Sequence, residues 1–208
     1  MRVIAGKAKG RQLSPVRGPG TRPMTDRAKS ALFSIIEANI TGADFLDLFA
    51  GTGQVGIEAL SRGARRAVFV EQGPAALRTI ESNLTTTRLS QNATLVRADV
   101  FRLLEGTSQP FDYVFVAPPQ YRGWWVRTLQ IIDNRPEWLN EDAWVIVQIN
   151  PIEYAPVELT HLVLFDQRSY GSVMLCFYGQ PSDLDEEEGK PDVEISEQAE
   201  HSDEEDGE

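Results

Sequence analysis

The sequence has one cysteine, Cys176, and no apolar run long enough to cross a membrane. A single thiol cannot form a disulfide within the chain, so a disulfide framework is excluded. The chain also lacks a signal-peptide apolar region and a run of about 18 apolar residues, so we expect a soluble cytoplasmic protein that does not bind membranes. No internal repeat is visible, and the 208 residues suit one domain with a substantial core.

Charge is unevenly distributed along the chain. The net charge is −11, but residues 181–208 hold 14 of the 31 acidic residues and only one basic residue, Lys190. This tail has few large apolar residues, so we expect it to be disordered. Residues 1–30 carry eight basic residues and a single acidic one, Asp26. Such a basic segment suits a nucleic-acid backbone, although lysines and arginines are also common on any solvated surface. The basic residues that we assign to RNA binding are Arg2, Lys7, Lys9, Arg11, Arg22 and Arg27.

Strand-like and helix-like patterns alternate through the middle of the chain. A capping hydroxyl at Thr25 predicts a helix start, and apolar runs without polar alternation predict strands buried on both faces. We expect strands at 44–49, 67–71, 93–98, 111–116 and 143–149, helices from 25 and at 53–62, 74–88 and 124–133, and a hairpin from 159–166 and 172–178. The pattern predicts an α/β fold: a doubly wound, mostly parallel seven-stranded sheet with a C-terminal antiparallel hairpin. We divide the chain into a basic extension (1–24), one domain (25–180) and the acidic tail (181–208).

The segment from Leu46 to Gly56 is typical of a nucleotide cofactor site. An apolar strand containing Asp47 leads into the glycine-rich turn at Gly51 and Gly53, and a helix follows at once. Glycines let the backbone turn sharply and approach a ligand, and the helix N-terminus favours polar ligand groups. The spacing of Gly51, Gly53 and Gly56 also fits the dinucleotide fingerprint of nicotinamide-dependent oxidoreductases. A carboxylate at Asp47 would disfavour a pyrophosphate, so we prefer a ligand that presents an amine.

Acidic residues and a double proline follow the next strands. Glu71 ends one predicted strand and could accept from ribose hydroxyls, and Asp99 ends another and could accept from an adenine amine. Either could instead be an ordinary solvated acid at a strand end. Pro118 and Pro119 come directly after a buried strand, where they fix the chain's exit and leave carbonyl groups unpaired.

Several ordered motifs are similar to one known family. They are Met1-Arg2-Val3-Ile4-Ala5-Gly6-Lys7, Arg22-Pro23-Met24-Thr25-Asp26-Arg27, Leu46-Asp47-Leu48-Phe49-Ala50-Gly51-Thr52-Gly53, Ile57-Glu58-Ala59-Leu60-Ser61-Arg62-Gly63-Ala64 and Ser169-Tyr170-Gly171. Over about residues 1–179, the chain resembles the RsmD-type 16S ribosomal RNA guanine-N2 methyltransferases. The resemblance implies a class I methyltransferase fold, S-adenosylmethionine (SAM) as methyl donor, and a guanine of 16S rRNA or a 30S assembly particle as acceptor. We expect a monomer without a metal ion.

The same resemblance implies the site residues. The SAM site would comprise Asp47, Phe49, Gly51, Thr52, Gly53, Glu71 and Asp99, and the catalytic pocket for the target base would comprise Ala117, Pro118, Pro119, Gln120 and Tyr121. The family holds the amine with a side-chain acceptor and the first proline's carbonyl, and it stacks an aromatic ring on the base.

The chain departs from the family motif in the base pocket. Ala117 stands where the family has Asp or Asn, and Gln120 stands where it has Tyr or Phe. The Gln120 amide could replace the acceptor, and Tyr121 could supply the ring one residue late. Three hypotheses follow: an active methyltransferase, a catalytically impaired protein that binds SAM or RNA, and, less favoured, a nicotinamide-dependent oxidoreductase.

Overall fold

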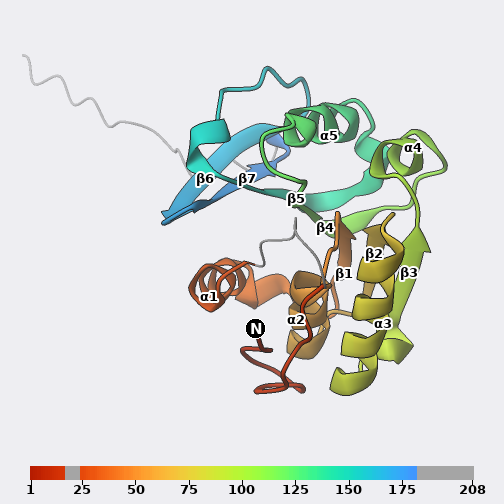
Figure 1. Cartoon of the computed structure of the whole chain (residues 1–208). Helices are drawn as coiled ribbons and strands as arrows, with labels where there is room; N and C mark the ends of the chain where they lie inside the picture. Colours follow the sequence, from red (N-terminus) through yellow and green to blue (C-terminus); the bar gives the residue numbers. More distant parts are fainter. Residues whose placement is uncertain (17–23, 182–208) are drawn as a thin grey trace, which may run out of the picture.

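The computed structural model of the protein describes residues 1–16 and 24–181. A seven-stranded sheet has the order β3-β2-β1-β4-β5-β7-β6 (Figure 1). The strands are β1 (Asp44–Leu48), β2 (Arg66–Glu71), β3 (Ala93–Arg97), β4 (Phe111–Val116), β5 (Leu139–Ile149), β6 (Val163–Tyr170) and β7 (Val173–Gly179). The helices are α1 (Asp26–Ile35), α2 (Gln54–Arg62), α3 (Pro74–Thr87), α4 (Val100–Glu105) and α5 (Trp124–Asp133), with short 3-10 turns at Glu37–Asn39, Ser90–Asn92, Pro136–Trp138 and Pro151–Glu153.

The pairing of the strands confirms the expected fold class. Strands β3, β2, β1, β4 and β5 pair in parallel, and β7 lies antiparallel between β5 and β6. The strand order reverses between β1 and β4, because β1 pairs with β2 on one side and with β4 on the other. In open α/β sheets, ligands bind at the carboxyl ends of the strands beside such a reversal.

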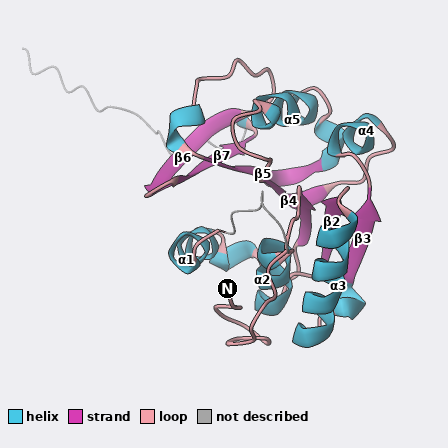
Figure 2. Ribbon diagram, in the orientation of Figure 1, coloured by secondary structure: helices cyan, strands magenta, loops and turns pink. Residues whose placement is uncertain are grey.

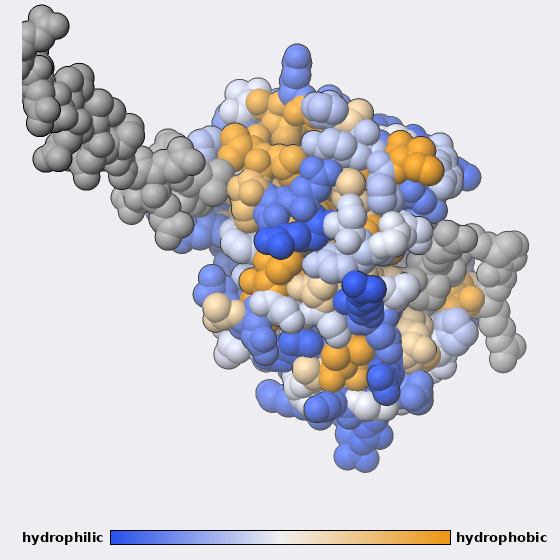
Figure 3. Space-filling view, turned by 90° about the vertical axis from the view of Figure 1, so that its left-hand side faces the viewer, coloured by the Kyte–Doolittle hydropathy of each residue, from blue (hydrophilic) through white to orange (hydrophobic). Residues whose placement is uncertain are grey.

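Helices cover both faces of the sheet and give it two cores. Figure 2 shows α1, α2 and α3 on one face and α4 and α5 on the other. Leu32, Ile57 and Ile80 pack in the first core, and Leu104 and Leu129 pack in the second. Figure 3 shows the side at the left of Figure 1, where apolar residues form separate patches among hydrophilic ones. No helix in residues 1–16 and 24–181 has the length and apolarity to span a membrane.

Helix boundaries follow the expected local signals. The Thr25 hydroxyl accepts from the Ala28 N–H at 3.2 Å and caps α1. Helix α2 ends at Arg62, and Gly63 follows with φ of 110°, a left-handed conformation that favours glycine.

The secondary structure differs from expectation in α4, at both ends of β6, and in β5, which begins at Leu139 rather than at residue 143. Helix α4 was not predicted, because only six residues separate its capping residue Asp99 from Gly106. The predicted loop at 167–171 is wrong, since β6 continues to Tyr170 and pairs with β7 up to a tight turn at Gly171. The predicted strand start at 159 is also wrong, because β6 begins at Val163.

The N-terminal segment packs against the domain. Val3, Ala8 and Leu13 are buried in the first core, and an isolated antiparallel bridge joins Arg2 to Gln12. Residues 1–16 therefore share the core of the domain. The tail at 182–208 lies outside the described residues, so its expected disorder stays a prediction.

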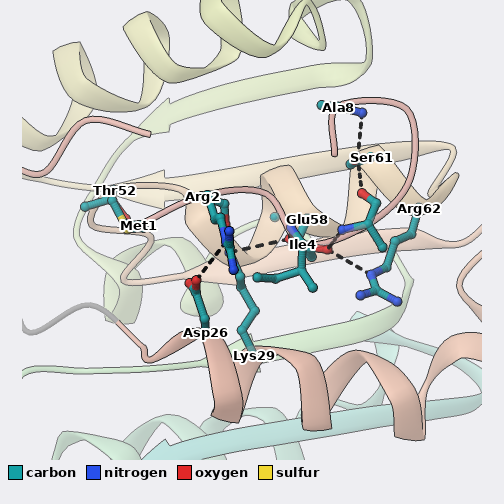
Figure 4. Close-up of polar contacts among 12 residues, drawn as sticks. Met1, Arg2, Ile4, Ala8, Asp26, Lys29, Thr52, Glu58, Ser61 and Arg62 are labelled. Atoms are coloured by element: carbon teal, nitrogen blue, oxygen red, sulfur yellow. Dashed lines mark hydrogen bonds and ion pairs between the residues drawn. The ribbon is translucent and has the colours of Figure 1, made fainter. Parts of the chain in front are cut away.

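A buried charged cluster fastens this segment to α2 (Figure 4). The Glu58 carboxylate accepts from the N–H groups of Ile4 at 2.8 Å and Ala5 at 2.9 Å. Lys29 is fully buried and lies 3.4 Å from Glu58, and its ammonium donates to the Arg2 carbonyl at 2.6 Å. Burial lowers the pKa of Lys29, and the nearby Glu58 charge opposes that shift. The buried charges of Lys29 and Glu58 lose contact with water, and the ion pair and charge-assisted hydrogen bonds of the cluster compensate for that loss.

Candidate functional site

A cavity of about 500 Å³ opens at the carboxyl ends of the central strands. This volume lies within the usual range for small-molecule sites. Its lining includes Asp47, Phe49, Gly51, Thr52, Glu71, Asp99, Ala117, Pro118, Pro119, Gln120 and Tyr121. We call the part formed by Asp47, residues 49–52, Glu71 and Asp99 the donor side, and the part formed by residues 117–121 and Gln148 the acceptor side.

The glycine-rich loop begins with an unusual backbone conformation. Phe49 has φ of 60°, although it is not a glycine, and Gly51 follows with φ of 56°. Non-glycine residues in this region store strain, which often accompanies a functional site. The Gly51 N–H donates to the Glu71 carboxylate at 3.0 Å, so strand β2 fixes the loop's position.

Asp47 lies at the base of the donor side and is buried. Its carboxylate accepts from the Gly56 N–H in α2 at 3.0 Å. Burial raises the pKa of Asp47 to about 8, the Gly56 hydrogen bond opposes the shift, and the Glu71 charge adds to it. Asp47 therefore carries a proton more readily than an ordinary carboxyl group, and a cation beside it would favour its ionised form.

Glu71 and Asp99 lie at the ends of neighbouring strands. Glu71 accepts from Gly51 and also from the Gly73 N–H, the latter at 2.7 Å, so one carboxylate connects two loops. Asp99 caps α4 by accepting from the Arg102 N–H at 3.1 Å, and it also lines the cavity. Both carboxylates are half-buried and retain oxygen lone pairs that can accept from a ligand.

An aromatic cluster lies beside these carboxylates. Phe49, Phe101 and Trp124 lie with ring centroids 5.7 to 6.2 Å apart. Trp124 lines the cavity, whereas Trp125 is buried and stacks on Tyr154. The two adjacent tryptophans therefore differ: Trp124 belongs to the cavity and Trp125 to the core.

The N-terminal segment also reaches the glycine-rich loop. The Asn83 side chain in α3 donates to the carbonyls of Thr52 at 3.0 Å and Ser14 at 3.1 Å. Its oxygen accepts from the Ser14 N–H at 2.8 Å. The Thr52 hydroxyl lies 3.6 Å from the Met1 sulfur. The donor side therefore rests on contacts with residues distant in sequence.

The acceptor side begins where β4 ends. The Ala117 N–H pairs weakly with the Leu48 carbonyl at 3.5 Å, and the chain then leaves the sheet through Pro118 and Pro119. Ala117 offers the cavity only a methyl group. Gln120 and Gln148 bring amide groups to the same lining, so an acceptor is available although the motif's side-chain acceptor is absent.

Tyr121 stands at the rim of this side with φ of 62°. Its N–H donates to Glu153 at 2.5 Å, and its hydroxyl accepts from the Asn150 amide at 3.2 Å. Both partners belong to the segment that follows β5. The family motif has its aromatic ring at position 120. In this chain the ring at the cavity belongs to Tyr121, one residue later.

The structure brings most predicted site residues together, with some exceptions. Gly53 does not line the cavity. It precedes α2 with φ of 72°, and a Cβ there would lie 3.1 Å from Ile80. The basic residues that were assigned to RNA do not line the cavity either; Arg2, Lys7, Lys9, Arg11 and Arg27 are exposed, and Arg22 lies outside the described residues.

Several lining residues were missed. They include Met24, Gln54, Gln72, Arg122 and Gln148. Gln148 had a signal in the sequence, because it is a lone polar residue near the carboxyl end of an apolar strand. Gln54, Gln72 and Arg122 each directly follow a predicted site residue in the sequence, whereas Met24 reaches the cavity from the segment before α1.

The sheet order and the residues that line this cavity define a class I methyltransferase, an enzyme class that takes its methyl group from SAM. A family model described as "Conserved hypothetical protein 95" matches residues 1–179. The chain is 33% identical over 178 residues to the Escherichia coli protein named "Ribosomal RNA small subunit methyltransferase D", covering 86% of this chain and 89% of that one. The chain therefore belongs to this family of rRNA methyltransferases.

Solved structures support the fold. The protein yhhF from E. coli superimposes with a TM-score of 0.77 at 32% identity, covering 86% of this chain and 97% of that one. An RNA methyltransferase from Salinibacter ruber, in complex with S-adenosyl-L-homocysteine, has a TM-score of 0.59 at 16% identity and covers 82% of this chain and 97% of that one. At that identity the second structure shows the shared fold alone.

Proposed function

We propose that the protein transfers a methyl group from SAM to the exocyclic N2 amine of a guanine in 16S rRNA. One observation carries the proposal: a single cavity joins a donor side of carboxylates and a glycine-rich loop to an acceptor side that follows a double proline. Family membership supports the same reaction, because the curated E. coli relative is named a small-subunit rRNA methyltransferase.

The donor side has groups that suit each part of SAM. Ionised Asp47 would hold the ammonium of the methionine end, Glu71 the ribose hydroxyls, and Asp99 the adenine amine. The ring of Phe49 packs at the same wall and would exclude water from the adenine. Bound SAM would supply an electrophilic methyl group with a good leaving group, so the protein needs no strong base and acts mainly by positioning.

The acceptor side would orient the guanine amine. The Pro118 carbonyl and the Gln120 amide oxygen would each accept one of the amine hydrogens. Holding these hydrogens lets the nitrogen lone pair turn from the ring toward the methyl group. The released proton then passes to water, since the cavity opens to solvent at Tyr121, which is exposed.

The basic residues outside the cavity would bind the rRNA backbone. Arg2 lies 3.2 Å from Asp26, whereas Lys7, Lys9 and Arg11 are exposed on the N-terminal segment. Lys7 follows the residues that Glu58 anchors, so the backbone beneath these cations is fixed. We further propose that the substrate is 16S rRNA or a 30S assembly particle, that the protein is cytoplasmic, and that it acts as a monomer.

Labelled SAM and 30S subunits that lack rRNA methylation provide the test. The protein should transfer label to 16S rRNA, and digestion to nucleosides should yield N2-methylguanosine. Label in another nucleoside would reject the proposed acceptor. An absence of label, with SAM binding intact by calorimetry, would reject methyl transfer.

Ala117 favours a second candidate, a family member that binds SAM and RNA with impaired chemistry. The motif's acceptor is missing there, and one catalytic hydrogen bond can change a rate about 100-fold. Ala117→Asp would restore that acceptor at the cavity wall. If the wild type is inactive and this variant transfers label, the impaired function is correct. Equal or lower activity in the variant favours an active wild type that uses Gln120.

A further inference from the structure

Two large apolar side chains are far more exposed than any other in the described part of the chain. Tyr121 is 66% exposed and Ile152 is 85% exposed, whereas Val163 and Leu164 follow at 36% and 37%. Tyr121 lies at the rim of the cavity, and Ile152 lies in the turn directly after β5. Exposed apolar groups at the rim of a ligand cavity often mark a contact surface.

One hydrogen-bonded cluster holds both residues. The Asn150 amide donates to the Tyr121 hydroxyl at 3.2 Å, and its oxygen accepts from the Ile152 N–H at 3.1 Å. Glu153 accepts from the Tyr121 N–H at 2.5 Å and from the Asn150 N–H at 3.4 Å. The positions of Tyr121 and Ile152 are therefore set together by two side chains.

The cluster also offsets an unfavourable backbone conformation. Tyr121 has φ of 62°, a left-handed conformation that is strained for a bulky residue and persists only where surrounding contacts compensate for it. Glu153 fixes the N–H of this residue, and Asn150 fixes the far end of its ring. The strained backbone thus keeps an aromatic ring at the rim.

A cation lies beside the same rim. The Arg122 guanidinium lines the cavity and lies 5.1 Å from the Trp124 ring centroid. The Arg127 guanidinium lies 3.9 Å from the Phe101 ring centroid and 3.9 Å from the Glu105 carboxylate, outside the cavity lining. Both arginines are exposed, and Arg122 follows Tyr121 directly. A partner at this rim must therefore offer flat apolar faces together with negative charge, as an unpaired RNA strand does.

We propose that Tyr121 and Ile152 form one RNA-binding surface, which contacts the unpaired strand that carries the target nucleotide. Tyr121 stacks on the target base, Ile152 packs against the adjacent nucleotide, and Asn150 and Glu153 are positioning residues that hold the two. This inference rests on the proposed function, since it names how the same cavity receives its RNA.

A fluorescent base tests the stacking step without any methyl transfer. The probe is a short pyrimidine RNA with a single 2-aminopurine, a guanine analogue whose fluorescence falls when it stacks on an aromatic ring. The full chain should quench this probe. Tyr121→Ala should abolish the quenching and weaken RNA binding about 10-fold or more, because stacking on an aromatic side chain is sequence-tolerant and strong.

Ile152→Ala tests the second half of the surface. The side chain is exposed, so its truncation should leave the unfolding midpoint unchanged while it weakens RNA binding about fivefold. Val163→Ala is the matched control, because it truncates an exposed β-branched residue on β6, away from the cavity, and should bind RNA as the wild type does. Equal affinities for Ile152→Ala and the wild type would overturn the proposal.

Asn150→Ala tests positioning, because it leaves the ring in place but removes the donor to its hydroxyl. We expect weaker quenching and a higher KM for RNA, with unchanged binding of S-adenosylhomocysteine by calorimetry. Unchanged quenching would reject the positioning role.

Two outcomes separate this inference from the proposed function. Quenching by the wild type without methyl transfer would reject the proposed function and keep the RNA-binding surface. Methyl transfer with wild-type KM in Tyr121→Ala would reject the RNA-binding surface and keep the proposed function.

Discussion

The donor and acceptor sides of the cavity are supported in different ways. On the donor side, Asp47 and Thr52 are buried, and Glu71 connects two loops through short hydrogen bonds. On the acceptor side, Ala117 is half-buried, and Pro119 and Tyr121 are exposed. A substitution on the donor side disturbs the packing of several helices and strands. A substitution on the acceptor side disturbs fewer packing contacts, because its residues are more exposed. This difference explains how residues 117 and 120 can depart from the family motif while the fold is kept.

The largest effect should come from Glu58, which supports the donor side from a distance. Glu58→Ala leaves Lys29 buried without its partner and leaves the N–H groups of Ile4 and Ala5 unpaired. We expect a loss of about 3 to 5 kcal/mol in the free energy of unfolding, measured with urea. Glu81→Ala, on the exposed face of α3, should change it by less than about 0.5 kcal/mol. A loss below about 1 kcal/mol in Glu58→Ala would show that the N-terminal segment contributes little to the fold.

Glu71 tests the donor side directly. Glu71→Ala removes the acceptor of Gly51 and Gly73 and the proposed acceptor of the ribose hydroxyls. We expect the affinity for SAM to fall about 100-fold, equivalent to about 2.7 kcal/mol, in calorimetry. Glu71→Gln keeps the shape and one acceptor oxygen, so it should lose less. Wild-type affinity in Glu71→Ala would place the ribose elsewhere.

Gln120 tests the acceptor side. Gln120→Ala should lower kcat about 10-fold by removing one acceptor of the guanine amine, while SAM affinity stays unchanged. Gln130→Ala, on the exposed face of α5, is the control and should keep the wild-type kcat. A fall in SAM affinity with Gln120→Ala would mean that the two sides of the cavity are not separable.

The donor side was more predictable from sequence than the acceptor side, for a physical reason. Asp47, Gly51 and Glu71 sit at strand ends, and the parallel sheet brings such ends together whatever the intervening loops do. Thr25 and Gly63 likewise fixed helix boundaries through local hydrogen bonds. These signals lie within a few residues of the features that they predict.

Contacts between distant segments were not predictable in the same way. Asn83 joins Ser14 to Thr52, and nothing near Asn83 in the sequence indicates either partner. The support of Tyr121 by Asn150 and Glu153 crosses about 30 residues and depends on how β5 is placed beside β4. Helix α4 was missed because so short a helix has no clear apolar period.

The pH dependence of Asp47 gives the smallest effect on ligand affinity and a direct contrast between the two sides. Burial raises its pKa to about 8 from the usual value of 3.8, so the native state holds this proton more tightly than the unfolded chain does. Ionising Asp47 therefore costs stability between about pH 4 and pH 8, and the loss is complete above about pH 8. Asp47→Asn cannot ionise, so its free energy of unfolding should exceed that of the wild type increasingly as the pH rises through this window.

Ligand affinity should show the opposite trend. The ammonium of SAM needs the ionised carboxylate, so affinity should rise about fivefold from about pH 7 to pH 8, with a proton released from Asp47 on binding. Calorimetry in buffers of different ionisation enthalpy measures that release directly. In Asp47→Asn the affinity should be weaker and independent of pH in this range, whereas RNA binding on the acceptor side should match the wild type. A pH-independent affinity in the wild type would mean that Asp47 is already ionised in the free protein, and the stability difference from Asp47→Asn should then vanish as well.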